Sequence, residues 1–363
     1  MLIKYFIGKA LQENRPNINQ KRCVNRSSKM QRCTECKDAC PVGAICMDNK
    51  IAHVDEESCK GCGICRAICP SQAISLKKDD EIKAIRQLEQ KEIIVVGCHE
   101  EGNGGNITVS CLNGLHQEYL AACLMALKGK KIYFNLCKCE DCYIKDGSKC
   151  FENSLKNVTA FLKHFDIHPQ IELLLNQENI PQYMNQTISR RDLFTLFKKQ
   201  STNVVSEIVD DAVGRESHFI QRDFILEHMD NLIRKSREHI EIPRSESLFT
   251  NWRVHDNCSS CGLCQTTCPS KAWKVQKHKG HVTISHNARL CTSCGLCEDL
   301  CPQKALSKDT FSTALFVGFT LKKEIPLSLC KQCGKEYVPN KEDHKLCHIC
   351  QKRRMVKQSI LRT

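Results

Sequence analysis

The spacing of the cysteines constrains this chain more than any other feature. The 28 cysteines fall into tight groups, and residues 151–257 contain none. In the block 258–302 the pattern C-x2-C-x2-C-x3-C-P occurs twice. Such short gaps favour metal binding over disulfide formation, because a disulfide framework uses more scattered cysteines. Three thiolates at two-residue gaps can wrap one [4Fe-4S] cubane, while the fourth points towards a second cluster.

The C-terminal block therefore predicts two clusters with crossed ligands. The two predicted ligand sets are Cys258, Cys261, Cys264 and Cys301, and Cys291, Cys294, Cys297 and Cys268. Structural zinc is the alternative, but the C-x3-C-P ending is typical of cubane ligands. In these motifs the block resembles the bacterial two-cluster ferredoxins, and the resemblance implies a pseudo-symmetric module that carries electrons.

The N-terminal block repeats this pattern with one irregularity. Its second half is regular, but in its first half Met30 occupies the position of the first ligand. The nearest upstream thiol is Cys23, and the nine residues before Cys33 can form an excursion that returns the chain to the cluster. The predicted ligand sets are Cys23, Cys33, Cys36 and Cys69, and Cys59, Cys62, Cys65 and Cys40. If Cys23 does not bind, a three-iron cluster is the alternative.

Between the two blocks, apolar patterning predicts a small parallel α/β domain, with strands near 92–97 and 131–136 and helices near 117–127 and 154–165. Cysteines gather where the carboxyl ends of its strands should meet, an edge that often binds ligands. The favoured thiolates are Cys98, Cys111, Cys139 and Cys142. They predict a further cluster or a zinc ion, and ordinary reduced thiols are the alternative. Residues 93–172 are similar to the α/β domain of hydrogenase delta-type electron-transfer subunits, which implies a [2Fe-2S] cluster.

The C-terminal tail contains two C-x2-C pairs thirteen residues apart. The four cysteines are Cys330, Cys333, Cys347 and Cys350. Two such knuckles place four thiolates tetrahedrally, as in a zinc ribbon, and a small hairpin of this kind needs metal to fold. Zinc is therefore the favoured ion, and rubredoxin-like iron is the alternative.

The sequence thus predicts an α+β chain built from two bacterial-type dicluster ferredoxin modules and three other parts. The expected ranges are a ferredoxin module at 1–80, the α/β domain at 90–172, a helical linker at 173–250, a second ferredoxin module at 251–310 and a zinc-ribbon-like hairpin at 326–355. Helical patterning within the linker is clearest at 189–197 and 217–226.

Charge and hydropathy narrow the classes of function. The net charge of +13 would fall by about eight when four thiolate-bound clusters form. No apolar run approaches the length that spans a bilayer, and the N-terminal segment has lysines inside its apolar stretch. We therefore expect a cytoplasmic protein that does not insert into membranes.

No arrangement of nucleophile, base and acid with usable spacing is present in the sequence. We expect a non-catalytic electron-transfer component that works with a partner oxidoreductase or dehydrogenase. One alternative is a redox sensor that binds nucleic acid, because the tail is basic, although nucleic acid is not the expected partner. Another alternative is an oxidoreductase with a metal-based active site in the α/β domain.

Overall fold

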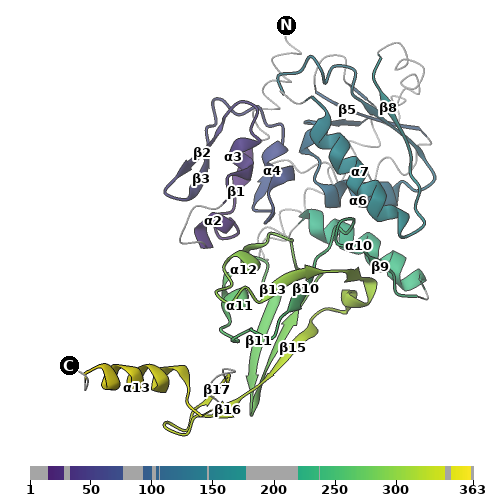
Figure 1. Ribbon diagram of the computed structural model, residues 1–363. Coiled ribbons are helices and arrows are strands. Elements are labelled where there is room, and N and C mark those ends of the chain that lie inside the picture. Colours follow the sequence, from purple (N-terminus) through teal and green to yellow (C-terminus); the bar gives the residue numbers. More distant parts are fainter. Residues whose placement is uncertain are drawn as a thin grey trace, which may run out of the picture. The chain divides into compact units, whose positions relative to one another are not determined.

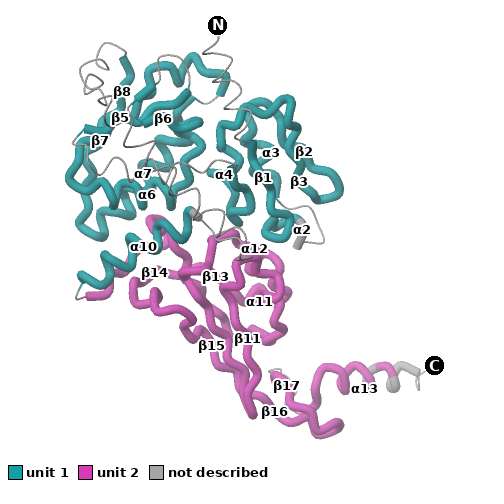
Figure 2. Tube along the Cα trace, turned by 180° about the vertical axis from the view of Figure 1, so that it is seen from behind, with its two compact units in different colours: residues 1–25, 30–237 teal, residues 26–29, 238–363 magenta. Residues whose placement is uncertain are grey.

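A computed structural model describes most of the chain in two compact units (Figure 2). The described residues are 15–27, 33–76, 93–99, 104–105, 107–144, 147–176, 220–236, 238–339 and 345–360. The first unit comprises residues 1–25 and 30–237, and the second comprises residues 26–29 and 238–363. Met30 and the predicted helix at 189–197 lie outside the described residues. Within the described part of the chain, no helix combines the length and the hydropathy needed to cross a bilayer.

The first unit begins with an N-terminal module, residues 15–76, made of two antiparallel strand pairs and short helices (Figure 1). Its elements are β1 (Pro16–Ile18), α2 (Val24–Ser27), α3 (Glu35–Asp38), β2 (Ile45–Asp48), β3 (Ile51–Val54), α4 (Ile64–Ile68) and β4 (Ile74–Leu76). β1 pairs with β4, so both ends of the module meet, while β2 and β3 form a hairpin. Asn49 and Lys50 both have positive φ, as a two-residue hairpin turn requires.

The middle α/β domain follows in the same unit. Its elements are β5 (Ile93–Cys98), β6 (Ile107–Val109), η1 (Leu112–Gly114), α6 (Gln117–Ala126), β7 (Lys131–Asn135), α7 (Lys149–Lys163) and β8 (Gln170–Leu174). The strand order is β6-β5-β7-β8 and every pairing is parallel. β5 is a continuous apolar run because it lies inside this sheet and is buried on both faces.

Helix α10 (Ile220–Lys235) lies in the range expected to be a linker. The structure assigns it to the first unit, where it packs against α6 of the α/β domain. The rings of Tyr119 on α6 and Phe224 on α10 have their centroids 5.8 Å apart. This helix is therefore part of a packed domain and does not act as a free connection.

The second unit repeats the plan of the N-terminal module. Its elements are β9 (Glu241–Ile242), β10 (Asn251–Val254), α11 (Leu263–Thr267), β11 (Trp273–His278), β12 (His281–His286), α12 (Leu296–Asp299), β13 (Leu306–Asp309), β14 (Phe311–Ser312), η3 (Thr313–Val317), β15 (Thr320–Pro326), β16 (Ser328–Leu329), β17 (Glu336–Tyr337) and α13 (His348–Ile360). β10 pairs with β13 and β11 with β12, as β1 pairs with β4 and β2 with β3. β15 adds a third strand to the hairpin and leads into the tail.

Candidate metal centres

The structure brings one group of four cysteines together in the first half of the N-terminal module. Cys23, Cys33, Cys36 and Cys69 line the same pocket. Burial raises the pKa of Cys36 to about 12, and the charged neighbours that add to the rise are the other three thiols of this group. Cys36 and Cys69 are buried, and Cys23 and Cys33 are half-buried. Four thiols in one such place can hold a cation that replaces their protons, since a thiolate needs a partner of this kind away from water.

Asn25 is the residue that closes the long gap between Cys23 and Cys33. Its side chain is fully buried. Its Nδ2 donates to the carbonyl oxygen of Cys33 at 2.6 Å, and its Oδ1 accepts from the Cys33 backbone N–H at 2.9 Å. These two bonds hold the segment that carries Cys23 beside Cys33. Sequence reasoning missed Asn25, because a lone asparagine in a polar stretch gives no signal of burial.

A second group of four lies in the other half of the module. Cys40, Cys59, Cys62 and Cys65 make up this group. Burial raises the pKa of Cys62 to about 11, and Cys40 and Cys59 add to the rise. Cys40 therefore lies with the thiols of the second half, while Cys69 lies with those of the first, which is the crossed arrangement that the spacing predicted.

The C-terminal module contains two groups with the same crossing. The first group is Cys258, Cys261, Cys264 and Cys301, and the second is Cys268, Cys291, Cys294 and Cys297. Burial raises the pKa of Cys264 and of Cys294 to about 12 in each case. The thiols that add to the rise are Cys258, Cys261 and Cys301 for Cys264, and Cys291 and Cys268 for Cys294.

Every cysteine that precedes a proline sits in the same turn. In each turn the backbone N–H of an alanine four residues later donates to the cysteine Sγ, at 3.2 Å or 3.3 Å. The pairs are Ala44 to Cys40, Ala73 to Cys69, Ala272 to Cys268 and Ala305 to Cys301. Each of the four thiol groups thus receives at least one backbone donor, and such donors stabilise negative charge on the sulfur.

Two of the four groups have side-chain hydrogen-bond partners as well. Ser71 Oγ is 3.7 Å from Cys69 Sγ, and Ser270 Oγ is 3.5 Å from Cys268 Sγ. The indole N–H of Trp273 also donates to Cys297. Sequence reasoning missed these donors, although the triplet Cys-Pro-Ser at 69–71 and again at 268–270 was visible.

The tail cysteines are packed more tightly than the cysteines of the modules. The sulfurs of Cys330, Cys333, Cys347 and Cys350 all lie within 4.8 Å of one another, and those of Cys333 and Cys347 are 3.8 Å apart. Tetrahedral zinc with Zn–S bonds of about 2.3 Å places its sulfurs about 3.8 Å apart. Among the described residues, none of the four module groups is as compact. The tail therefore suits a single ion, and the modules suit a larger group such as a cubane.

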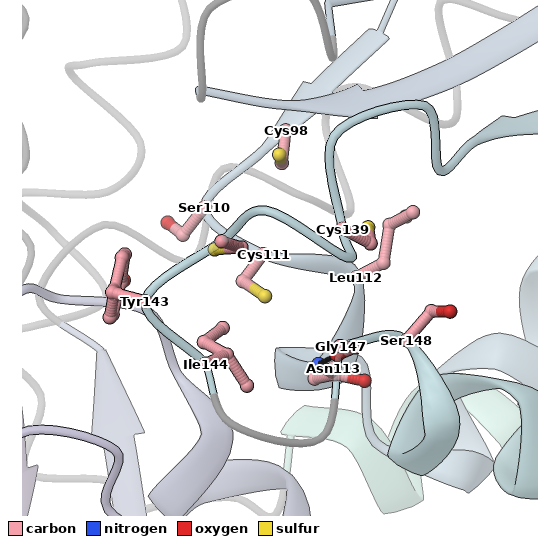
Figure 3. A pocket seen from close by; sticks show the side chains of 11 residues that line it. Cys98, Ser110, Cys111, Leu112, Asn113, Cys139, Tyr143, Ile144, Gly147 and Ser148 are labelled. Atoms are coloured by element: carbon pink, nitrogen blue, oxygen red, sulfur yellow. Dashed lines mark hydrogen bonds between the residues drawn. The ribbon is translucent and has the colours of Figure 1, made fainter. Parts of the chain in front are cut away.

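The α/β domain holds a fifth thiol group at the carboxyl edge of its sheet. Cys98 ends β5, Cys111 follows β6, and Cys139 and Cys142 lie in the loop after β7. All four line one pocket, and Figure 3 shows Cys98, Cys111 and Cys139 around it. Parallel strands end at the same edge, which is why residues so far apart in the chain meet here. The pocket can hold a metal centre with four thiolate ligands.

Cys137 lies close to this group in the sequence but does not line the pocket. Its Sγ points to the carbonyl oxygen of Leu174, at 3.4 Å, at the end of β8. Asn113 donates to the carbonyl oxygen of Gly147 at 2.7 Å and accepts from the backbone N–H of Phe151 at 2.8 Å. Asn113 thereby ties the segment after Cys111 to the loop that carries the other thiols. It is a second buried asparagine that the sequence did not point to.

Both modules are similar to known iron–sulfur domains. Residues 257–305 match the model of the 4Fe-4S dicluster domain, and residues 52–75 match that of the 4Fe-4S binding domain. A pyruvate synthase subunit PorD from Methanothermobacter marburgensis is 32% identical over 65 residues, which are 18% of this chain and 68% of that protein. The chain belongs to the 4Fe-4S dicluster ferredoxin family. The prediction of two ferredoxin modules is thereby confirmed.

Two further relatives match shorter parts of their own length. A component of an ion-translocating oxidoreductase complex from Methanosarcina acetivorans is 47% identical over 45 residues, which are 12% of this chain and 17% of that component. An uncharacterized ferredoxin from Methanocaldococcus jannaschii is 48% identical over 42 residues, which are 12% of this chain and 28% of that protein. The likeness thus concerns ferredoxin modules, and the resemblance of residues 93–172 to hydrogenase delta-type subunits stays a prediction.

Proposed function

We propose that this ferredoxin-family chain is an electron-transfer protein that binds four [4Fe-4S] clusters, one in each thiol group of its two modules. The main support is that sixteen cysteines lie in four groups, each made of three cysteines from one half of a module and one from the other half. In each group a backbone N–H donates to one sulfur. When bound, such clusters accept and release single electrons at potentials set by hydrogen bonds and solvent exposure. The chain supplies the thiolates, the donors and the burial.

A partner oxidoreductase would supply or use these electrons. Two relatives are named as components of larger oxidoreductases, an ion-translocating oxidoreductase complex and pyruvate synthase. Their names support a role for this chain beside a catalytic partner, as a subunit or as a separate carrier. We also propose a cytoplasmic location, because reduced thiols persist in a reducing compartment.

Two more metal sites belong to the proposal. The thiol pocket of the α/β domain would hold a further iron–sulfur centre, which is supported by its four converging cysteines. The tail would hold zinc, which is supported by the 3.8 Å separation of Cys333 and Cys347. In the tail, the backbone N–H of Cys347 donates to Cys330 Sγ, and it is the largest of several hydrogen bonds that lower the pKa of Cys330 to about 6. That hydrogen bond favours the thiolate that a zinc ion requires.

Iron, sulfide and zinc content per chain, measured on protein purified without oxygen, tests the proposal. Four cubanes require about sixteen iron atoms and an equal amount of sulfide, and a [2Fe-2S] centre in the α/β domain raises the iron to about eighteen. Electron paramagnetic resonance after dithionite reduction should show S = 1/2 signals that interact. The exposed Cys46 belongs to none of the groups, so Cys46→Ser is a control that should change nothing. Much zinc with little iron and sulfide would overturn the proposal.

A further inference from the structure

The segment 111–118 connects two of these thiol sites within the first unit. It begins at Cys111, which lines the pocket of the α/β domain, and runs through η1 into α6. Its residue Gly114 lies against the loop of the N-terminal module that carries Cys62. A Cβ atom at position 114 would stand 2.3 Å from the carbonyl oxygen of Cys62 and 3.2 Å from the carbonyl carbon of Gly63. Only glycine permits this approach of the two backbones.

A buried arginine fixes the same contact from the other side. Arg66 follows Cys65 in α4, and its Nη2 donates to the carbonyl oxygen of Gly114 at 2.9 Å. The Arg66 side chain is only 3% exposed, although arginine is rarely buried to this extent. The helix that carries Cys65 is therefore bonded directly to the segment that carries Cys111.

A second buried contact lies four residues further along the chain. Glu118 accepts from Gln72 of the N-terminal module at 2.8 Å and forms an ion pair with Arg222 of α10. All three side chains are buried. The ion pair holds the Glu118 carboxylate in place inside the α/β domain, and the hydrogen bond from Gln72 joins that carboxylate to the N-terminal module.

The contact lies close in sequence to a candidate ligand on each side. Cys111 stands three residues before Gly114, and the carbonyl oxygen that faces Gly114 belongs to Cys62 itself. Segments from two domains meet here at their candidate ligands.

We propose that residues 111–118 form a fixed joint that makes the α/β thiol pocket the redox neighbour of the site formed by Cys40, Cys59, Cys62 and Cys65. This inference rests on the proposed function, since both sites must hold their centres. With both centres bound, a single electron would pass between them, so that one site would be oxidised as the other is reduced and no bond would form or break. The α/β domain would then exchange electrons with the N-terminal module inside the first unit.

Substitution of Gly114 tests the joint in the full-length protein. Gly114→Ala should force the two backbones apart, because the added Cβ meets a backbone carbonyl oxygen and not the end of a flexible side chain. Gly104→Ala is the matched control, because Gly104 lies in the same domain and a Cβ there meets nothing within 4 Å. Arg66→Met is a milder variant that removes the bond to Gly114 and keeps the bulk of the side chain.

The readout is the power saturation of the reduced S = 1/2 signals, with iron measured on the same samples. Cys142→Ser, which removes one thiol from the pocket, defines the signal without the neighbouring centre. We expect the parent and Gly104→Ala to need several-fold more microwave power for saturation than Cys142→Ser does. Gly114→Ala and Arg66→Met should shift towards Cys142→Ser while they keep the iron of the parent.

Each other outcome overturns a distinct claim. If Cys142→Ser leaves both the iron content and the spectra unchanged, Cys142 holds no iron centre, so the four-thiolate centre and the joint built on it are wrong, while the four cubanes stand. If Cys142→Ser loses iron but saturates like the parent, the centre exists and the joint is wrong. If Gly114→Ala loses iron, Arg66→Met decides, and an Arg66→Met protein with full iron and the saturation of the parent contradicts the joint.

Discussion

The side-chain amide of Asn25 bonds to both backbone polar groups of Cys33. This contact brings Cys23 and Cys33 together although nine residues separate them, whereas only two residues separate the first and second cysteines of the other half-modules. Closing a longer loop costs chain entropy, which grows only slowly with length. Two hydrogen bonds at a fully buried residue can offset a cost of that size.

Cys23→Ser should remove one thiolate from the first group and leave the other three groups intact. We expect loss of iron, or conversion of one cluster to a three-iron form, because three thiolates remain in place. Iron analysis and electron paramagnetic resonance of the oxidised protein measure this change. Unchanged spectra would show that Cys23 is not a ligand, and Cys46→Ser provides the baseline for a cysteine outside the groups.

Asn25→Ala should weaken the same site without touching a thiol. The substitution leaves the backbone N–H and carbonyl of Cys33 without their partners, at a cost of about 1–3 kcal/mol for each buried group. We expect faster loss of iron from one cluster when a chelator is added, measured by the decay of visible absorbance. Asn17 is exposed in the same module, and Asn17→Ala should show the rate of the parent.

Trp273→Phe should lower the reduction potential of one cluster in the C-terminal module. The indole N–H donates to Cys297, and the removal of a donor to sulfur disfavours the added electron. Trp252 is the matched control, because its ring is buried in the same core and its Nε1 makes no hydrogen bond within the described structure. A redox titration followed by electron paramagnetic resonance measures both variants, and equal shifts would point to packing instead.

Zinc removal should unfold the tail alone. The hairpin of β16 and β17 has two residues in each strand, too few to be stable without a metal. Cys330→Ser should lose the zinc of the parent and make the tail sensitive to protease, while iron and sulfide stay at the level of the parent. Loss of iron in place of zinc would show a rubredoxin-like site.

The stability of the C-terminal module should fall as the pH drops below about 6.5. Burial, reinforced by Lys322, lowers the pKa of His286 to about 3. The unfolded chain binds this proton at higher pH than the folded chain does, so the stability present above the unfolded pKa is lost towards pH 3, at most about 1.4 kcal/mol per pH unit. His286→Phe keeps a ring 4.6 Å from Trp273 and should have a shallower dependence in urea titrations at pH 7 and pH 5. Parallel slopes would exclude His286 as the cause.

The thiol groups could be proposed from the sequence because short gaps and the Cys-Pro turn act locally. The same holds for β5, β7 and α6, whose apolar patterns are long enough to read. β6 has three residues, too few for a pattern, and the start of α7 at Lys149 was placed five residues late. Asn25, Asn113 and the contact of Arg66 with Gly114 depend on segments that meet only in the folded chain. No local signal marks such residues.

The crossed cysteines also set an order for synthesis. Cys69 completes the thiol groups of the N-terminal module, but Cys301 completes the first group of the C-terminal module, which Cys258 begins. About 230 residues separate these two closing cysteines, roughly 10 to 50 s of elongation at usual rates. During synthesis, all the cysteines of the N-terminal module are therefore present in the nascent chain, ready to receive iron and sulfide, while the C-terminal module is still incomplete. A chain truncated just before Cys301 would lose one ligand of its last module and keep the first module whole.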